Sequence, residues 1–441
     1  MTNNKKLYIK SKFLSYVLPS VAAMWVYTIY TMVDGIFVAR GVSKTALAAV
    51  NISMPMINVA FAVGILFAVG ASTKASIFKG QNKPENANRV FTLSTLTVAV
   101  IGILVMAVIK LNLTWTATML GATQETIEYV KDYLGVIIMF VPFYMTSYNL
   151  EVLIKADGFP KTAIKTSVLG AFTNIVLDAL FVLVFHWGIT GAAVATGLSQ
   201  VLTFSVYLRH FLSKRSGFSF VKIKWKIKDA SGIAKLGIAD FITEISAGLC
   251  IFIFNHILLR VSGNDGVVIY TVISYFSQLI LMTMIGINQG AQPLISYYHG
   301  KEKGEFCSYI FKTALICAGA CSLIAFAIGV IYPNPIVGVY IDKATDSLLF
   351  ERGVEAFRLY SVSFLPLGIV TTLMGYFTSM EMPKFAMSIS LGRGLVFITA
   401  FMMMFSAFMG EKGVWLSAAA SEICALMLGL ILFRRQKRII K

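Results

Sequence analysis

Four side chains able to bind a small cation or a proton lie inside apolar stretches of the chain: Asp34, Asn174, Asp178 and Thr196. A carboxylate in the hydrocarbon region costs roughly 2.5–3.5 kcal/mol on insertion scales, so such residues usually face a pathway or a partner. Asn174 and Asp178 are four residues apart, which places both on one helix face. Carboxylate, amide and hydroxyl oxygens suit a small hard cation. Two close carboxylates in a low dielectric also resist ionising together, so a site where one holds a proton is equally open.

A second candidate site centres on Glu244, which lies 12 residues into a later apolar stretch. A carboxylate at that depth, facing a cleft, would attract a lipophilic cation. Aromatic rings and methionine thioethers suit flat organic cations. The candidates to line such a cleft are Tyr30, Tyr144, Tyr148, Tyr275 and Met282. The alternative for each of these side chains is ordinary packing against lipid or a neighbouring helix.

The elements that carry these residues are long apolar runs. Apolar residues make up 57% of the 441 residues and charged residues 13%, about half the roughly 25% of globular domains, with a mean hydropathy of +0.77. About 20 apolar residues cross a bilayer as a helix. We predict twelve such spans at 13–38, 46–71, 90–110, 129–152, 164–186, 189–210, 232–259, 267–298, 307–332, 354–379, 386–409 and 413–433. The predicted fold class is therefore an all-α polytopic membrane protein.

The distribution of basic residues predicts the orientation. If the amino terminus is cytoplasmic, the cytoplasmic tails and loops hold 29 of the 38 Lys and Arg residues. This asymmetry is the positive-inside signal, and it predicts a multi-pass cell-membrane protein with both termini in the cytoplasm. The net charge of +17 follows from that topology. Because the basic residues flank the spans and do not interleave with exposed aromatics, we expect no nucleic-acid partner.

Helix rise then predicts the depth of each polar residue. At 1.5 Å per residue, Asp34 lies about 31 Å and Asp178 about 21 Å from the cytoplasmic starts of their spans. Thr196 lies about 10 Å inward from the outer face, so these residues are expected at one level in the outer half. Glu151 and Asp157 fall at cytoplasmic helix ends, where solvation is the expectation.

An internal repeat divides the chain in two. A shift of 220 residues lays 64–91 on 284–311 without a gap, with eight identities that include Gly70 with Gly290 and Gly80 with Gly300. Each half contains six spans, so the halves are parallel repeats that rock against each other around a central cleft. We predict an amino-terminal bundle at 1–212, a basic cytoplasmic linker at 213–231 and a carboxy-terminal bundle at 232–441.

The motifs of several enzyme classes are missing from the sequence. It contains no H-E-x-x-H pair and no P-loop, so we expect no enzyme and no nucleotide-driven pump. Uphill transport would then draw on a proton or sodium gradient, with no cofactor. Intramembrane aspartyl chemistry by Asp34 and Asp178 remains a formal alternative, which requires their carboxyls to lie within hydrogen-bonding reach.

Several short motifs together resemble the multidrug and toxic compound extrusion (MATE) family. They are the run Thr31–Arg40, Leu120-Gly-Ala-Thr123, Asn174-Ile-Val-Leu-Asp178, Trp187–Thr196 and Gly286-Ile-Asn-Gln-Gly-Ala-Gln-Pro293. The resemblance implies two six-helix bundles in a V shape. It also implies a monomeric antiporter in the lipid bilayer, which exports small organic cations in multidrug efflux in exchange for protons or sodium ions.

The resemblance also carries residue roles. By this resemblance, four residues would form the cation site of the amino-terminal bundle: Asp34, Asn174, Asp178 and Thr196. They would be metal ligands if the coupling ion is sodium. Glu244 matches an acid that some members carry. The acid that one sodium-coupled branch has in the tenth span falls near Leu367, which puts a carboxy-terminal ion site in doubt. The runner-up function is a flippase for a lipid-linked precursor, which would need deep Arg or Lys, whereas the deep charges expected here are acidic.

Overall fold

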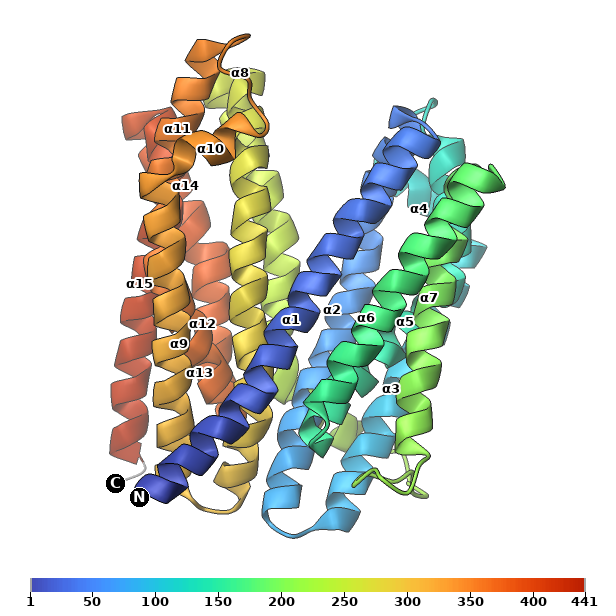
Figure 1. Cartoon of the computed structure of the whole chain (residues 1–441), viewed down its shortest axis with the longest axis vertical. Coiled ribbons are helices and arrows are strands. Elements are labelled where there is room, and N and C mark those ends of the chain that lie inside the picture. The colour runs from blue at the N-terminus through green and yellow to red at the C-terminus, as the bar shows by residue number, and fades with distance from the viewer. Residues whose placement is uncertain (1, 440–441) are drawn as a thin grey trace.

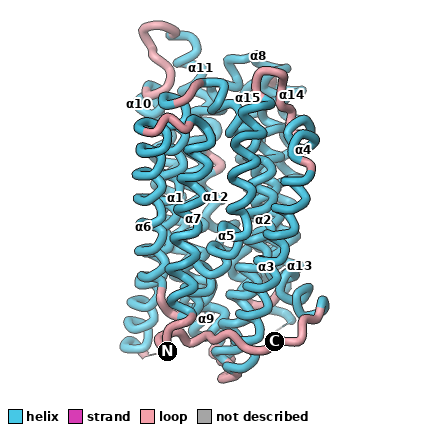
Figure 2. Tube along the Cα trace, turned by 90° about the vertical axis from the view of Figure 1, so that its right-hand side faces the viewer, coloured by secondary structure: helices cyan, strands magenta, loops and turns pink. Residues whose placement is uncertain are grey.

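The computed structural model of the chain describes residues 2–439, and most of them are helical. Inside a bilayer every backbone polar group must be satisfied within the protein. This explains why the described residues form long helices and no strands. In Figure 2 the connecting loops gather mainly at the two ends of the molecule, and both termini lie at the same end.

The long helices lie roughly along the long axis of the molecule (Figure 1). In chain order they are α1 (Asn3–Gly41), α2 (Lys44–Gly80), α3 (Pro84–Leu111), α4 (Leu113–Met119), α5 (Ile127–Asp157), α6 (Pro160–Asp178), the π-helix η1 (Ala179–Val184), α7 (Gly188–Phe211), α8 (Ile227–Gly300), α9 (Gly304–Ile331), α10 (Pro333–Gly338), α11 (Ser347–Ser361), α12 (Phe364–Ser379), α13 (Pro383–Leu391), the π-helix η2 (Gly392–Phe397), α14 (Ile398–Met409) and α15 (Glu411–Ile439).

Helix α8 consists of two membrane spans. Its 74 residues would extend about 110 Å as one helix, far more than a bilayer of about 30 Å. The chain breaks at Gly263, whose φ of 65° lies in the left-handed region that glycine adopts without strain. The described residues contain eleven helices long and apolar enough to span, with α8 counted once. Dividing α8 gives the twelve predicted spans.

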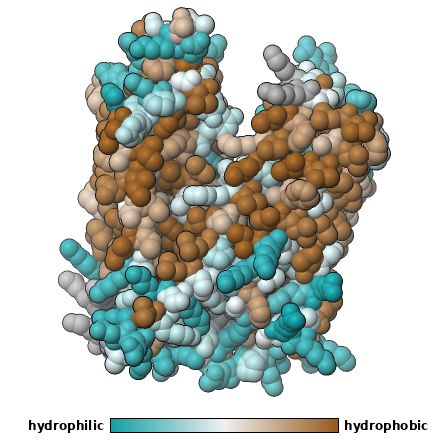
Figure 3. Space-filling model, in the orientation of Figure 1, coloured by the Kyte–Doolittle hydropathy of each residue, from teal (hydrophilic) through white to brown (hydrophobic). Residues whose placement is uncertain are grey.

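The spans form two bundles that diverge towards one end (Figure 1). Figure 3 shows a notch between the bundles at that end, an apolar band across the visible face of both, and hydrophilic surface at the opposite end. The predicted arrangement of two bundles is confirmed. Helix α1 joins them, because Phe13 packs in a buried cluster with residues of α8, α9 and α12, whereas Val38 packs in the cluster of the amino-terminal bundle.

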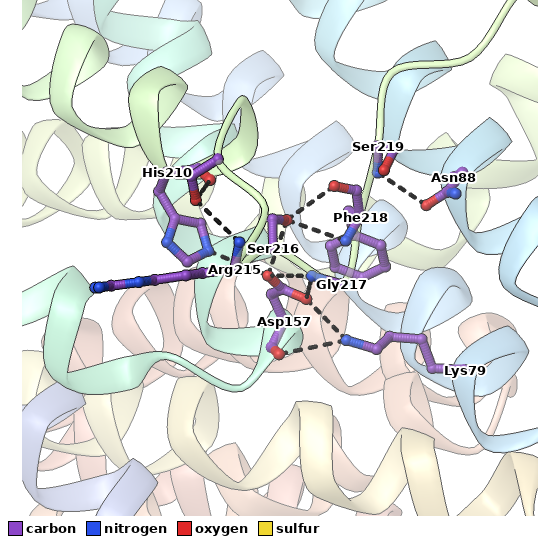
Figure 4. Close-up of polar contacts among 10 residues, drawn as sticks. Lys79, Asn88, Asp157, His210, Arg215, Ser216, Gly217, Phe218 and Ser219 are labelled. Carbon is purple, nitrogen blue, oxygen red and sulfur yellow. Dashed lines mark hydrogen bonds and ion pairs between the residues drawn. The ribbon is translucent and has the colours of Figure 1, made fainter.

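The linker between the bundles is tied to the amino-terminal bundle through Asp157 (Figure 4). The Asp157 carboxylate accepts hydrogen bonds from Lys79 Nζ at 2.9 Å, Ser216 Oγ at 3.0 Å and the backbone N–H of Gly217 at 3.0 Å, and His210 Nε2 lies 3.1 Å away. The Asp157 side chain is fully buried, so the expectation of a solvated acid is wrong. Local sequence position did not reveal that the linker folds back over this helix end.

Candidate functional site

The four polar residues predicted to share one level are brought together in the amino-terminal bundle. Asp34 comes from α1, Asn174 and Asp178 from α6, and Thr196 from α7. The Asp34 and Asp178 carboxyls lie close enough to interact with each other, and the Asn174 side chain lies near Asp178. Asn174 Nδ2 also donates to Thr196 Oγ1 at 3.3 Å.

Local backbone geometry accompanies this cluster. Asp178 is the last residue of α6, and the chain continues directly into the π-helix η1. A π-helical turn adds a residue to the helix and is frequent at functional sites. Its wider turn changes the direction of the side chains that follow, and η1 itself packs against α1 and α7.

Acceptor oxygens outnumber donors in the cluster. Asp34 Oδ1, Asn174 Oδ1 and both carboxylate oxygens of Asp178 are buried, and none has a hydrogen-bond partner within the described residues. Two facing carboxylates form a hydrogen bond only when one carries a proton. An orphaned buried acceptor is costly, so the cluster fits either a bound proton or a small cation held by oxygens.

Tyr133 belongs to the same neighbourhood and was missed at the level of sequence. It lies on α5, is almost fully buried, and its hydroxyl is close enough to Asp34 and Asp178 to interact electrostatically with both. The sequence does not show that Tyr133 lies near the two acids, because Tyr133 is on α5 whereas Asp34 is on α1 and Asp178 is on α6. Depth along α5 is the one signal that would have suggested it.

A central cavity of about 100 Å³ lies between the two bundles. Its lining comes from α1, α2, α5, α6 and α7 on one side and from α8 on the other. It includes five of the six residues predicted for substrate binding: Glu244, Tyr30, Tyr144, Tyr148 and Met282. The sixth, Tyr275, does not line this cavity; it is 44% exposed and stacks on Tyr340 with ring centroids 5.7 Å apart.

Aromatic rings form a continuous wall in the cavity. Phe61 of α2 stacks on Tyr144 at 5.2 Å, meets Tyr148 edge-on at 4.8 Å, and stacks on Tyr27 at 6.5 Å between ring centroids. Phe61 was absent from the sequence-derived set, although it is the ring that connects the tyrosines. Such a wall offers several π faces to a flat cation.

Glu244 faces this wall from the opposite bundle. Its carboxylate is close enough to Tyr27, Tyr144 and Tyr148 to interact with them electrostatically. No residue of the described chain forms an ion pair with it. One carboxylate without a basic partner, opposite aromatic rings, is an arrangement that attracts a positively charged organic molecule.

The floor of the cavity is a polar network that joins the bundles. Lys155 of α5 pairs with Glu151 at 2.8 Å and donates to Gln289 Oε1 of α8 at 2.7 Å. Gln289 Nε2 in turn donates to the Tyr148 hydroxyl at 3.0 Å. The Glu151 side chain is 14% exposed and pairs with Lys155, so the expectation that Glu151 is solvated at a helix end is wrong. This network was missed because Lys155 and Gln289 are 134 residues apart in the chain.

The carboxy-terminal bundle holds a second buried ion pair. Arg393, in the π-helix η2, pairs with Glu422 of α15, and Ser421 Oγ donates to the carbonyl of Arg393. The expectation that deep charges are only acidic is therefore wrong for Lys155 and Arg393. Each of these basic residues is neutralised by a carboxylate, so the unpaired deep charges that remain in the described chain are acidic.

The two bundles, the aromatic cavity and the carboxylate cluster define a polytopic membrane transporter. The chain belongs to the MatE family, whose model matches residues 19–180 and 241–404. It is 25% identical over 434 residues to "Multidrug export protein MepA" of Staphylococcus aureus (strain MRSA252), covering 97% of this chain and 94% of that protein. The protein of the same description from Staphylococcus haemolyticus is 24% identical over 429 residues, with the same coverage.

Solved structures share the fold. One is described as the outward-facing conformation of a multidrug resistance MATE family transporter of the MOP superfamily, with a TM-score of 0.90 at 20% identity, covering 97% of this chain and 96% of that one. A MOP superfamily transporter from Pyrococcus furiosus matches with the same TM-score, identity and coverage.

Proposed function

We propose that this protein is a multidrug antiporter that exports organic cations across the cell membrane in exchange for protons or sodium ions. The observation that carries the proposal is the separation of two acidic sites. The Asp34 and Asp178 pair lies within one bundle and has orphaned buried oxygens, whereas Glu244 faces a cavity between the bundles. The curated relatives named as multidrug export proteins support the same activity.

Alternating access supplies the mechanism. With both termini in the cytoplasm, the notch between the bundles opens outward in this conformation. A cation that enters from the cytoplasm binds between Glu244 and the aromatic wall. Entry of the coupling ion at Asp34 and Asp178 from outside then neutralises their charge and favours the state that has released the drug. Ion and drug must each prefer a different state, because a ligand shifts an equilibrium only through differential affinity.

Within the described residues, the central cavity has no basic side chain in its lining that could bind the phosphates of a lipid-linked precursor, as a flippase would require. Its lining contains the acids Glu151 and Glu244 and no basic residue. Lys155 lies just below and is engaged by Glu151 and Gln289. A lipid diphosphate in this cavity would meet net negative charge, which disfavours that substrate class.

Efflux from proteoliposomes tests the proposal. Purified protein is reconstituted, ethidium is provided on one side, and a sodium gradient or a pH gradient is imposed separately. We expect ethidium movement against its gradient with at least one of the two ions, and none when both gradients are collapsed. Transport that requires ATP and survives gradient collapse would contradict the proposal.

A further inference from the structure

A second cavity, of about 570 Å³, lies at the end of the molecule that carries the termini. It opens to the surface and is lined by the last turns of α2, the first turns of α3, the linker and the first turns of α8. Its lining residues are Lys74, Phe78, Asn86, Arg89, Val90, Leu93, Lys222, Ile223, Lys224, Lys226, Asp229 and Ile233. Neither of the two acidic sites described above contributes to it.

The charge of this cavity is strongly positive. Five of its residues are basic and Asp229 alone is acidic, for a net charge of +4. None of the five basic side chains forms an ion pair with any residue of the described chain. Basic groups gathered without acidic partners repel one another, so they form a site that an anion stabilises.

The linker presents its basic residues in a regular pattern. From Val221 to Lys226, before α8 begins, apolar and basic residues alternate, which in an extended segment sends them to opposite faces. The segment is held on α3, because the Val221 N–H donates to Thr92 Oγ1 at 3.1 Å and Trp225 Nε1 donates to Thr97 Oγ1 at 3.2 Å. The apolar side chains at 221 and 223 pack inward, and Lys222 and Lys224 are exposed.

An apolar stripe leads away from the cavity along α3. Helical spacing places Arg89, Leu93, Leu96, Val100 and Ile103 on one face. Arg89 and Leu93 line the cavity, and the next three are 47%, 43% and 51% exposed. A ligand with a phosphate in the cavity would thus find an apolar surface for a chain directly above it.

Exposed aromatic and apolar side chains lie at the same depth along the molecule as the basic cavity. Trp225 is 59% exposed and Ile227 81% exposed, beside the basic residues. Trp at this position, with one edge bonded to Thr97 and the rest exposed, is typical of the headgroup level of a bilayer. The cavity therefore lies where the phosphates of the adjoining leaflet lie.

The internal repeat provides a comparison within the molecule. The shift of 220 residues pairs Lys74 with Leu294 and Arg89 with Tyr309. The fold of the repeat therefore does not require basic residues at these places. Their presence in the first bundle alone indicates a role in binding and not in folding.

We propose that this cavity binds the phosphate of an anionic phospholipid, with an acyl chain along the exposed stripe of α3. Basic pockets between membrane helices on the cytoplasmic side suit such headgroups. The site is independent of the export function proposed above. It would anchor the linker and the first bundle to the leaflet while the second bundle moves.

The test is native mass spectrometry of the full-length protein in a neutral detergent, titrated with phosphatidylglycerol, phosphatidylcholine or inorganic phosphate. We expect one phosphatidylglycerol to bind in preference to phosphatidylcholine, and millimolar phosphate not to displace it. The combined variant Lys222→Gln, Lys224→Gln and Lys226→Gln should weaken that binding by roughly 100-fold, since each basic group near the headgroup contributes about fivefold.

The matched control removes three basic residues elsewhere at the same end: Lys301→Gln, Lys303→Gln and Lys384→Gln. It should bind phosphatidylglycerol as the unaltered protein does. Equal loss in both triple variants would mean diffuse attraction by charge, and the proposal would fall. Displacement of the lipid by phosphate alone would show that the cavity takes the free anion, which also overturns it.

Discussion

Gly80 and Gly300 make the same contact from opposite bundles. Gly80, at the end of α2, lies directly against the carbonyl oxygen of Tyr297 on α8, and Gly300 lies against that of Ile77 on α2, with no space for a Cβ at either glycine. Ile77 and Tyr297 are themselves separated by the 220-residue shift of the repeat. The two bundles are thus related by a pseudo-two-fold axis at this end, as parallel repeats require.

Replacing Gly80 with valine should open this end of the molecule. A side chain there collides with the Tyr297 backbone, which cannot rotate away as a flexible side chain would. We expect faster hydrogen–deuterium exchange at the ends of α2 and α8, and a large loss of efflux. Gly304→Ala is the control, because nothing lies within 4 Å of its Cβ position. Unchanged exchange in Gly80→Val would mean that the contact does not hold the bundles together.

Lys155→Met should destabilise the protein through the acid that it leaves behind. Glu151 would then be a largely buried charge without a partner, and removing one member of a buried ion pair typically costs about 3–5 kcal/mol. We expect a lower thermal midpoint in detergent. The double variant Lys155→Met with Glu151→Gln should recover much of the loss, since neither charge remains. A double variant as unstable as the single one would show that the bond from Lys155 to Gln289 dominates.

Asp157→Asn should release the linker from the amino-terminal bundle. The charge that holds Lys79 and the Gly217 N–H would be lost (Figure 4). We expect trypsin to cleave after Lys214 and Arg215 at least several times faster in the variant. The control is Asp132→Asn, an exposed acid near the other end of the same helix. Equal cleavage rates in the two variants would show that the remaining contacts of the linker suffice.

The sequence predicted the parts of the site that depend on depth within a span. Polar residues in apolar runs stand out by their cost, and helix rise places Asp34, Asp178 and Thr196 at one level without knowledge of the packing. The twelve spans follow from the same argument, although the break at Gly263 within α8 is visible only as a short polar stretch.

The sequence did not predict contacts whose partners lie far away in the chain. From the sequence alone, Lys155 is expected to be an ordinary residue at a helix end, and only the structure shows its contact with Gln289. In the same way, Arg393 pairs with an acid on the next span. Tyr275 was predicted to line the cavity and does not, because position within a span predicts the depth of an aromatic ring but not the direction in which it points. Those features depend on how the helices rotate against each other.

Asp34→Asn should abolish ion-coupled export while leaving the fold intact, because it removes half of the charge that attracts the coupling ion. Asp178→Asn should have nearly the same effect. Thr196→Ala should weaken ion affinity by only about fivefold, since one neutral ligand contributes about 1 kcal/mol. Efflux driven by imposed sodium and pH gradients measures all three. If Asp34→Asn transports at the unaltered rate at every pH, Asp34 does not bind the coupling ion.

Glu244→Gln should weaken drug binding without removing the response to the coupling ion. The carboxylate is the unpaired charge in the central cavity, and the amide that replaces it has a similar shape but no charge. We expect affinity for a monocation to fall roughly tenfold and for a dication to fall more, since both ligand charges interact with the same carboxylate. Fluorescence titration in detergent, with and without sodium and at two pH values, measures these affinities.

Two comparisons make that result specific to the cavity. Tyr275→Phe, which alters a ring outside the cavity lining, should leave both affinities unchanged. Asp34→Asn should still bind drug but lose the change in affinity produced by sodium or pH, because the coupling free energy requires both ligands to act on the same pair of states. Should Glu244→Gln bind the dication as tightly as the unaltered protein, Glu244 is a structural acid, and the drug charge is met by Asp34 and Asp178 themselves.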